Sequence, residues 1–142
     1  MKTKPIIVEA IINAPVAKVW QALTTKQQMK EWYFDIPDFE LTTGSTFNFY
    51  EPGGNNKYHH QGTIKEIIID EKLQHTWTHP SHSKGESLLT WQLEPQNGRT
   101  KVTLTHEGTE NFVDGGSTFS RESYEAGWNE IVGESLKSFL EP

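Results

Sequence analysis

Cysteine is absent from the 142 residues, which excludes disulfides, thiolate zinc sites and cysteine nucleophiles. Basic residues are scarce: 13 Lys and Arg against 19 Asp and Glu give a net charge of −6, so the chain has no basic footprint for nucleic acid or for an anionic membrane. Glu9 interrupts the apolar stretch from Ile6 to Ile12, and elsewhere the longest purely aliphatic run is Ile67-Ile68-Ile69, far short of the roughly 18 residues of a membrane span. We therefore expect a soluble, cytoplasmic protein with no nucleic-acid partner and no membrane insertion.

Aromatic residues are plentiful by contrast. They make up 11% of a chain whose hydrophobic share is only 34%, and five of them are Trp. Leu, Ile, Val and Phe together are numerous enough for a hydrophobic core. The length matches one compact domain, which we expect to span residues 1–142.

The hydrophobic periodicity changes three times along the chain. Residues 6–13 are rich in β-branched side chains and predict a strand, and residues 15–23 follow with apolar positions at helical spacing. Thr24-Thr25 before Gln27 and Gln28 resembles a capping box and predicts a second short helix that reaches toward Trp32. From Phe47 to His106 the pattern alternates between turns, which predicts a meander of antiparallel strands. Residues 117–140 return to helical spacing and predict one long helix.

This order of elements predicts an α+β fold. A long helix with one apolar stripe must bury that stripe, and the only large surface available is an antiparallel sheet with an aromatic face. We therefore expect a curved sheet wrapped around the C-terminal helix, with two short helices after the first strand.

Several sequence blocks resemble a known family in their order and spacing. They are Ile12-Asn-Ala-Pro-Val-Ala-Lys-Val-Trp20, Gly44-Ser-Thr-Phe47-Asn-Phe49, Leu73-Gln-His-Thr-Trp77, Leu89-Thr-Trp91-Gln-Leu93 and Gly127-Trp128. They are similar to blocks of the bacterial activator of heat-shock protein 90 ATPase homologues. That family belongs to the START-like superfamily, also called SRPBCC or helix-grip, which includes polyketide cyclases and lipid-transfer domains. The resemblance implies a cavity between sheet and helix that in relatives admits an apolar small molecule.

Seven apolar or aromatic residues are candidates for the wall of such a cavity. We expect them between the sheet and the last helix, where they form either a solid core or the lining of a ligand site: Phe47, Phe49, Trp77, Trp91, Tyr124, Trp128 and Ile131.

Three histidines share strand parity with apolar neighbours, so His60, His75 and His106 are expected to face inward. A buried neutral imidazole can anchor a ligand carbonyl or hydroxyl, or act as a general acid or base. In the alternative interpretation each ring bonds to the backbone or to water and has no further role. We rank His75, between Leu73 and Trp77, first among the inward polar groups.

Other chemistry has less support in the sequence. The spacing of His75, His79 and His82, together with the pair His59-His60, could indicate a metal site. Pro80, however, places His79 and His82 in a loop, and no nearby carboxylate or Cys completes a tetrahedral ligand set. No Gly-x-Ser-x-Gly elbow indicates a hydrolase. We expect no metal and no cofactor.

Three functions remain open. The first is a small-molecule binding protein for an apolar, aromatic or lipid-like ligand. The second is a cyclase-like enzyme that uses an inward histidine as acid or base. The third, a chaperone-interaction module, follows from the family resemblance alone.

Overall fold

The computed structural model describes residues 4–50, 59–80, 83–115 and 121–141. The chain begins with strand β1 (Ile6–Ile12), followed by helices α1 (Val16–Thr24) and α2 (Lys26–Trp32). Five strands come next: β2 (Thr46–Tyr50), β3 (His59–Ile68), β4 (Lys72–Thr78), β5 (Glu86–Gln96) and β6 (Arg99–Glu107). The chain continues with the 3₁₀ helix η1 (Thr109–Gly115) and ends in a helical stretch built from α3 (Arg121–Glu130), η3 (Ile131–Leu136) and α4 (Lys137–Leu140).

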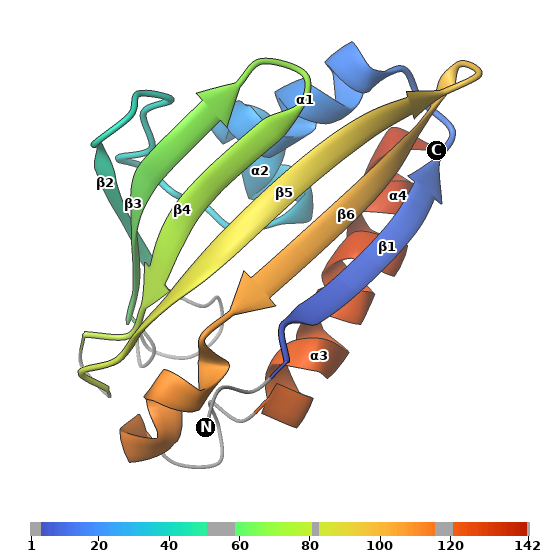
Figure 1. The fold of residues 1–142 in the computed structure, drawn as a ribbon. Coiled ribbons are helices and arrows are strands. Elements are labelled where there is room, and N and C mark those ends of the chain that lie inside the picture. The colour runs from blue at the N-terminus through green and yellow to red at the C-terminus, as the bar shows by residue number, and fades with distance from the viewer. Residues whose placement is uncertain (1–3, 51–58, 81–82, 116–120, 142) are drawn as a thin grey trace.

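The strands form one antiparallel sheet in the order β1-β6-β5-β4-β3-β2. β2 to β6 are a meander, and β1 pairs with β6 from Ile6 opposite His106 to Ile12 opposite Thr100. The sheet curves, and the C-terminal helical stretch lies against one of its faces (Figure 1). α3 and η3 contact β1, while α1 packs on β5 and β6. The α+β helix-grip architecture expected from the sequence is thus confirmed.

Strand alternation determines which side chains enter the interior. In β6, Val102, Leu104 and His106 are buried, whereas the residues between them are partly exposed. The C-terminal helical stretch supplies the opposite wall with Trp128 and Val132. The core therefore lies between the concave face of the sheet and this stretch.

The C-terminal helix differs from the expected uniform helix over residues 117–140. Its middle part, Ile131–Leu136, is π-helical, and residues 117–120 lie outside the described part of the chain. Trp128, Val132 and Leu136 are four residues apart and all buried. A spacing of four is compatible with an α-helix and with a π-helix, so hydrophobic periodicity could not separate them.

The expected capping box before α2 does not form. Thr25 occupies the N-cap position without a side-chain cap hydrogen bond. The hydroxyl of Thr24 instead donates to the Trp20 carbonyl oxygen at 2.7 Å. Thr24 is the last residue of α1, where a carbonyl one turn back is within reach of its side chain, so the hydroxyl is used there.

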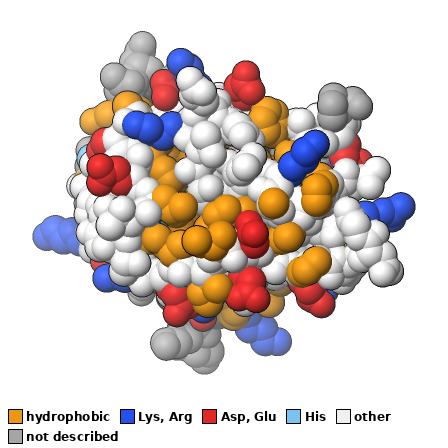
Figure 2. Space-filling model, turned by 90° about the horizontal axis from the view of Figure 1, so that it is seen from above, with side chains coloured by type: hydrophobic (Ala, Val, Ile, Leu, Met, Phe, Trp, Pro, Cys, Tyr) orange, Lys and Arg blue, Asp and Glu red, His pale blue; other side chains and the backbone are white. Residues whose placement is uncertain are grey.

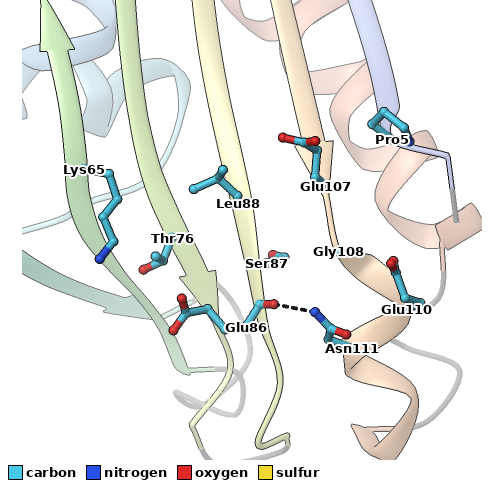
Figure 3. A pocket seen from close by; sticks show the side chains of 10 residues that line it. All are labelled: Pro5, Lys65, Thr76, Glu86, Ser87, Leu88, Glu107, Gly108, Glu110 and Asn111. Atoms are coloured by element: carbon cyan, nitrogen blue, oxygen red, sulfur yellow. Dashed lines mark hydrogen bonds between the residues drawn. The ribbon is translucent and has the colours of Figure 1, made fainter. Parts of the chain in front are cut away.

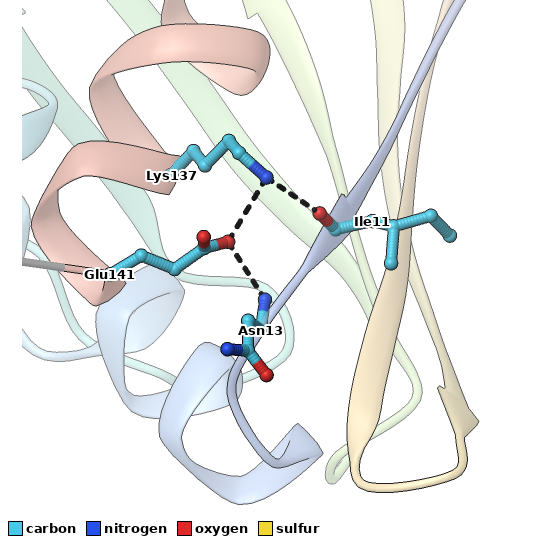
Figure 4. Close-up of polar contacts among 4 residues, drawn as sticks. All are labelled: Ile11, Asn13, Lys137 and Glu141. Carbon is cyan, nitrogen blue, oxygen red and sulfur yellow. Dashed lines mark hydrogen bonds and ion pairs between the residues drawn. The ribbon is translucent and has the colours of Figure 1, made fainter.

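Two side chains at the end of the C-terminal helix cover the free edge of β1 (Figure 4). Lys137 Nζ donates to the Ile11 carbonyl oxygen at 3.2 Å, and Glu141 Oε2 accepts from the Asn13 amide at 2.8 Å. Lys137 and Glu141 are also paired at 3.2 Å. The amide of Asn13 contributes most to holding the pKa of Glu141 below its ordinary value. This Lys137–Glu141 clamp occupies backbone groups that an edge strand otherwise leaves open.

Some apolar side chains remain on the exterior. Figure 2 shows the end of the molecule that carries α1 and the β3–β4 turn, where apolar side chains gather near the middle with charged ones around them. Ile68 and Ile69, at the end of β3 and in the turn after it, are 42% and 70% exposed. Within the described ranges, no helix has the length and apolar character to cross a membrane.

Candidate functional site

The predicted site residues converge on the interior between sheet and helix. Eight of the ten are buried, and Tyr124 and Ile131 on the helical stretch are partly buried against the same core. The buried eight come from β2, β3, β4, β5, β6 and α3: Phe47, Phe49, His60, His75, Trp77, Trp91, His106 and Trp128.

A small cavity lies in the interior, lined by residues of the described ranges. It has room of about 10 Å³ for the centre of a water-sized molecule, which corresponds to one water. Leu23, Met29, Ile36, Phe39 and Leu73 contribute apolar wall. The rest of the lining is Trp32, Tyr33, Phe47, His75 and Trp91.

His106 is the centre of a hydrogen-bond chain across four elements. Trp128 Nε1 donates to His106 Nδ1 at 3.0 Å, and His106 Nε2 lies 2.6 Å from Ser87 Oγ. Ser87 Oγ donates to the Trp77 carbonyl oxygen at 3.1 Å. An indole N–H can only donate, so Nδ1 is an acceptor, and the proton of the neutral ring is on Nε2.

This tautomer decides what the Ser87–His106 pair can do. Burial, and then the charges of His75 and His79, lower the pKa of His106 to about 3, so the ring is neutral near pH 7. Nε2–H therefore donates to Ser87, and no lone pair of His106 faces the serine hydroxyl to act as a base. The hydrogen bonds from Trp128 through His106 and Ser87 to Trp77 therefore hold α3, β6, β5 and β4 together. Ser87 and His106 do not form a hydrolase dyad.

His75 is engaged at only one nitrogen. Its Nδ1 lies 2.8 Å from the Thr76 carbonyl oxygen, which can only accept, so Nδ1 carries the proton. Burial lowers the pKa of His75 to about 4, against a smaller opposing effect of the Thr76 bond. Near pH 7 the ring is neutral, and Nε2 has a lone pair with no hydrogen-bond donor in the described part of the chain.

The indole ring of Trp77 is surrounded by four histidines. Its ring centroid lies between 5.2 and 6.4 Å from those of His60, His75, His79 and His106. Burial of His79, in the loop after β4, was not expected, yet its side chain is 1% exposed. A hydrogen bond joins His79 Nε2 to the Tyr124 hydroxyl. The sequence pattern could have predicted this burial, because His79 continues the every-second-residue spacing by which Leu73, His75 and Trp77 face the interior.

Tyr33 is a second residue that the sequence did not single out. It follows α2 directly, and its ring stacks on Trp32 with centroids 5.0 Å apart and meets Trp91 edge-on at 6.1 Å. Its hydroxyl is buried and has no hydrogen-bond partner among the described residues, as is also true of Trp77 Nε1. Burial raises the pKa of the Tyr33 phenol, which therefore keeps its proton. No motif marks Tyr33, since it lies in an irregular segment without strand or helix parity.

A wider hollow than the interior cavity lies on the opposite face of the sheet. It has a volume of about 790 Å³ and is open to solvent, with Lys65, Glu86, Glu107 and Glu110 around it (Figure 3). Asn111 Nδ2 donates to the Glu86 carbonyl oxygen at its edge at 2.8 Å. None of the predicted site residues lines it.

The histidines and carboxylates of the described ranges do not form a metal site. There, no three His, Asp or Glu side chains come together in a way that would hold an ion. His82, one of the spaced histidines, lies outside those ranges.

Comparison with solved structures shows the same fold in several bacterial proteins. Protein MLL2253 from Mesorhizobium loti has a TM-score of 0.82 at 23% identity, with 97% of each chain covered. The Aha1 dimer from Colwellia psychrerythraea has a TM-score of 0.74 at 26% identity, with 98% of this chain and 97% of that one covered. DynU16, from the dynemicin biosynthetic locus, has a TM-score of 0.81 at 22% identity over 98% of this chain, which spans only 48% of DynU16.

Comparison at the sequence level identifies the family. No curated protein matches the chain. The family described as activator of Hsp90 ATPase homolog 1-like proteins matches over residues 13–141, nearly the whole chain. That range includes α1, the strands β2 to β6 and the C-terminal helical stretch. This protein belongs to the family of activator of Hsp90 ATPase homolog 1-like proteins.

Proposed function

We propose that this protein binds a small, flat, largely apolar molecule between the concave face of its sheet and the C-terminal helical stretch. The observation that carries this proposal is the pair of unpartnered polar atoms in the aromatic interior, the Tyr33 hydroxyl and Trp77 Nε1. Buried polar groups in folded proteins are almost always hydrogen-bonded, and leaving one unpaired costs about 1–3 kcal/mol. A ligand with polar atoms that enters this interior would give these groups partners and remove that cost.

Entry of a ligand requires the wall of the small cavity to move. Ile36 and Phe39 supply part of this wall and belong to segment 33–45, which has no helix or strand. The segment is tied to β2 through Asp38, whose carboxylate accepts from the Asn48 amide at 2.9 Å and from Asn48 Nδ2 at 3.1 Å. Gly44 and Ser45 at its end are bonded to the backbone of Ile64 in β3, so outward movement of the residues before them would enlarge the cavity without breaking these bonds.

The five tryptophans provide a direct test. Trp32 and Trp91 line the cavity, and Trp77 and Trp128 pack edge-on with centroids 5.3 Å apart in the same interior, whereas Trp20 on α1 does not line it. In ¹⁵N-labelled protein we expect titration with phenol, toluene or indole to shift the four interior indole N–H signals together and to leave the Trp20 signal in place. Shifts confined to backbone amides of exposed loops, or no shifts with any compound up to its solubility limit, contradict the proposal.

Acid–base catalysis has a narrower basis in the same site. His106 has both ring nitrogens engaged, whereas His75 keeps one lone pair toward the interior. A single neutral imidazole without an opposed acid binds a proton donor more readily than it transfers protons at a carbon centre. The geometry thus supports a binding role above a cyclase-like one.

A further inference from the structure

We propose that the cavity beside Tyr33 and His75 recognises a hydroxyl group, so that the bound molecule is a neutral phenol or alcohol. This inference rests on the proposed binding function and specifies its ligand. Tyr33 and His75 come from different parts of the chain, the end of α2 and the middle of β4, yet both line the same small cavity.

His75 supplies the acceptor. Because Nδ1 donates to the Thr76 carbonyl oxygen, the second nitrogen of the neutral ring has a lone pair and no hydrogen. It can satisfy an O–H or N–H group of a ligand. It repels the lone pair of a ketone or ether oxygen placed in the same position.

Tyr33 supplies the donor. Its phenolic O–H is buried and meets no acceptor among the described residues, and the buried phenol keeps its proton. It can donate to a hydroxyl, carbonyl or ether oxygen. Of these three, only a hydroxyl can accept from Tyr33 and at the same time donate to His75.

The rest of the lining excludes charged ligands at this point. No Asp, Glu, Lys or Arg side chain lines the cavity, whose other walls are apolar or aromatic. A carboxylate or an ammonium group entering it would lose its hydration without a counter-charge. The space is that of one water, which also matches a single hydroxyl group. Edge-on pairs such as Tyr33 with Trp91, with planes at 86°, offer faces against which an aryl ring packs.

A matched series of phenol, toluene and anisole tests this inference on the unmodified protein. Phenol and toluene have the same shape and differ in the hydroxyl, while anisole keeps the oxygen but lacks the proton. Dissociation constants come from the interior indole N–H shifts. We expect phenol to bind about tenfold tighter than toluene or anisole, as two hydrogen bonds of ordinary strength allow.

Two variants test whether Tyr33 and His75 cause the preference for phenol over toluene, and a third variant is the control. In Tyr33→Phe and in His75→Phe the advantage of phenol over toluene should fall to less than about threefold, since each variant removes one of the two hydrogen bonds. Tyr50→Phe alters an exposed tyrosine on β2, 45% accessible, and should keep the full preference. If one of the two interior variants does not fold, the ligand series on the unmodified protein and on the other variant still tests hydroxyl recognition.

The outcomes separate this inference from the proposed function. If toluene and phenol bind equally well at the interior indoles, the proposed binding function stands and hydroxyl recognition is overturned. A phenol preference that persists in both interior variants would overturn the assignment to Tyr33 and His75. Absence of interior shifts with all three compounds would overturn the binding function itself, and hydroxyl recognition with it.

Discussion

His75 and His106 are both buried and neutral near pH 7, yet their ring nitrogens are used differently. His106 has a partner at each nitrogen and joins four elements, whereas His75 has one backbone partner and one lone pair. Both were expected to face inward, and both do. Their roles diverge because Trp128 and Ser87 lie beside one ring, while the small cavity lies beside the other.

The buried histidines should make stability depend on pH in the acid range. The pKa values of His75 (about 4) and His106 (about 3) in the folded protein lie below the ordinary value of 6.5. As pH falls below 6.5, both histidines bind protons in the unfolded chain but stay neutral in the folded protein. The free energy of unfolding therefore declines until the pH reaches their pKa values in the folded protein. Each group contributes about 1.4 kcal/mol per pH unit in this window.

Urea denaturation of the wild type and of His75→Phe at pH 6 and pH 5 measures the part due to His75. We expect the loss of unfolding free energy between these pH values to be smaller in the variant by about 1 kcal/mol. The carboxylates are the same in both proteins, so their contribution cancels in the difference. Equal losses in the two proteins would show that His75 is not buried and neutral.

The backbone at Gly62 leaves no room for a side chain. It lies opposite Phe47 in the β2–β3 ladder, and a Cβ added there would come within 2.6 Å of Phe47 Cζ and of the Thr76 carbonyl oxygen. The backbone contact cannot relax easily, so Gly62→Ala should lower the free energy of unfolding by about 1–3 kcal/mol. In the control Gly127→Ala a new Cβ meets nothing within 4 Å, and denaturant melts should show no loss. A Gly62→Ala protein as stable as wild type would mean that Phe47 does not lie over β3.

At the scale of elements, the Lys137–Glu141 clamp should protect the edge of β1. Glu141→Ala removes the acceptor of the Asn13 amide. Hydrogen exchange at that amide, followed by NMR, should become at least about tenfold faster. Glu130→Ala, at an exposed position of α3, is the control and should leave this amide unchanged. An unchanged exchange rate in Glu141→Ala would show that the helix end does not hold the strand edge.

Segment 33–45 should control access to the interior through Asp38. Asp38→Ala removes both hydrogen bonds to Asn48, and we expect faster association of phenol with little change in its equilibrium affinity at the cavity. Line shapes of the interior indole N–H signals measure the rates. Asp35→Ala changes an exposed neighbour in the same segment and serves as the control. Equal association rates in both variants would place the entry elsewhere.

At the scale of the whole molecule, the C-terminal helical stretch and the sheet should fold only together. Deleting residues 121–142 uncovers the concave face, including Trp77 and Trp91, which are 3% and 2% exposed in the intact protein. We expect circular dichroism to show no cooperative thermal transition for this truncated protein. Deleting only residues 137–142 keeps Trp128 and Leu136 and should retain a cooperative transition at a lower temperature. A sharp transition in the longer deletion would contradict the packing.

The order of elements and the inward faces of the strands could be read from the sequence by itself. Alternation over β3 to β6 and the apolar stripe of the last helix are local patterns, and a curved antiparallel sheet is the surface that buries such a stripe. The same alternation placed His60, His75 and His106 inside, and carried two residues further it also applies to His79.

Only the tertiary structure decided which interior atoms are paired. Tyr33 lies in an irregular segment, yet its ring contacts Trp91 and Trp128 in the aromatic interior. The tautomer of His106 depends on Ser87 and Trp128, which belong to other elements and lie 19 and 22 residues away in the chain. His75 bonds to the carbonyl of the next residue, and only the three-dimensional structure shows that its other nitrogen has no partner among the described residues. Hydrophobic periodicity reports which face of an element is buried. The partner of each buried polar atom, and therefore the chemistry of the site, depends on distances between elements that no local pattern encodes.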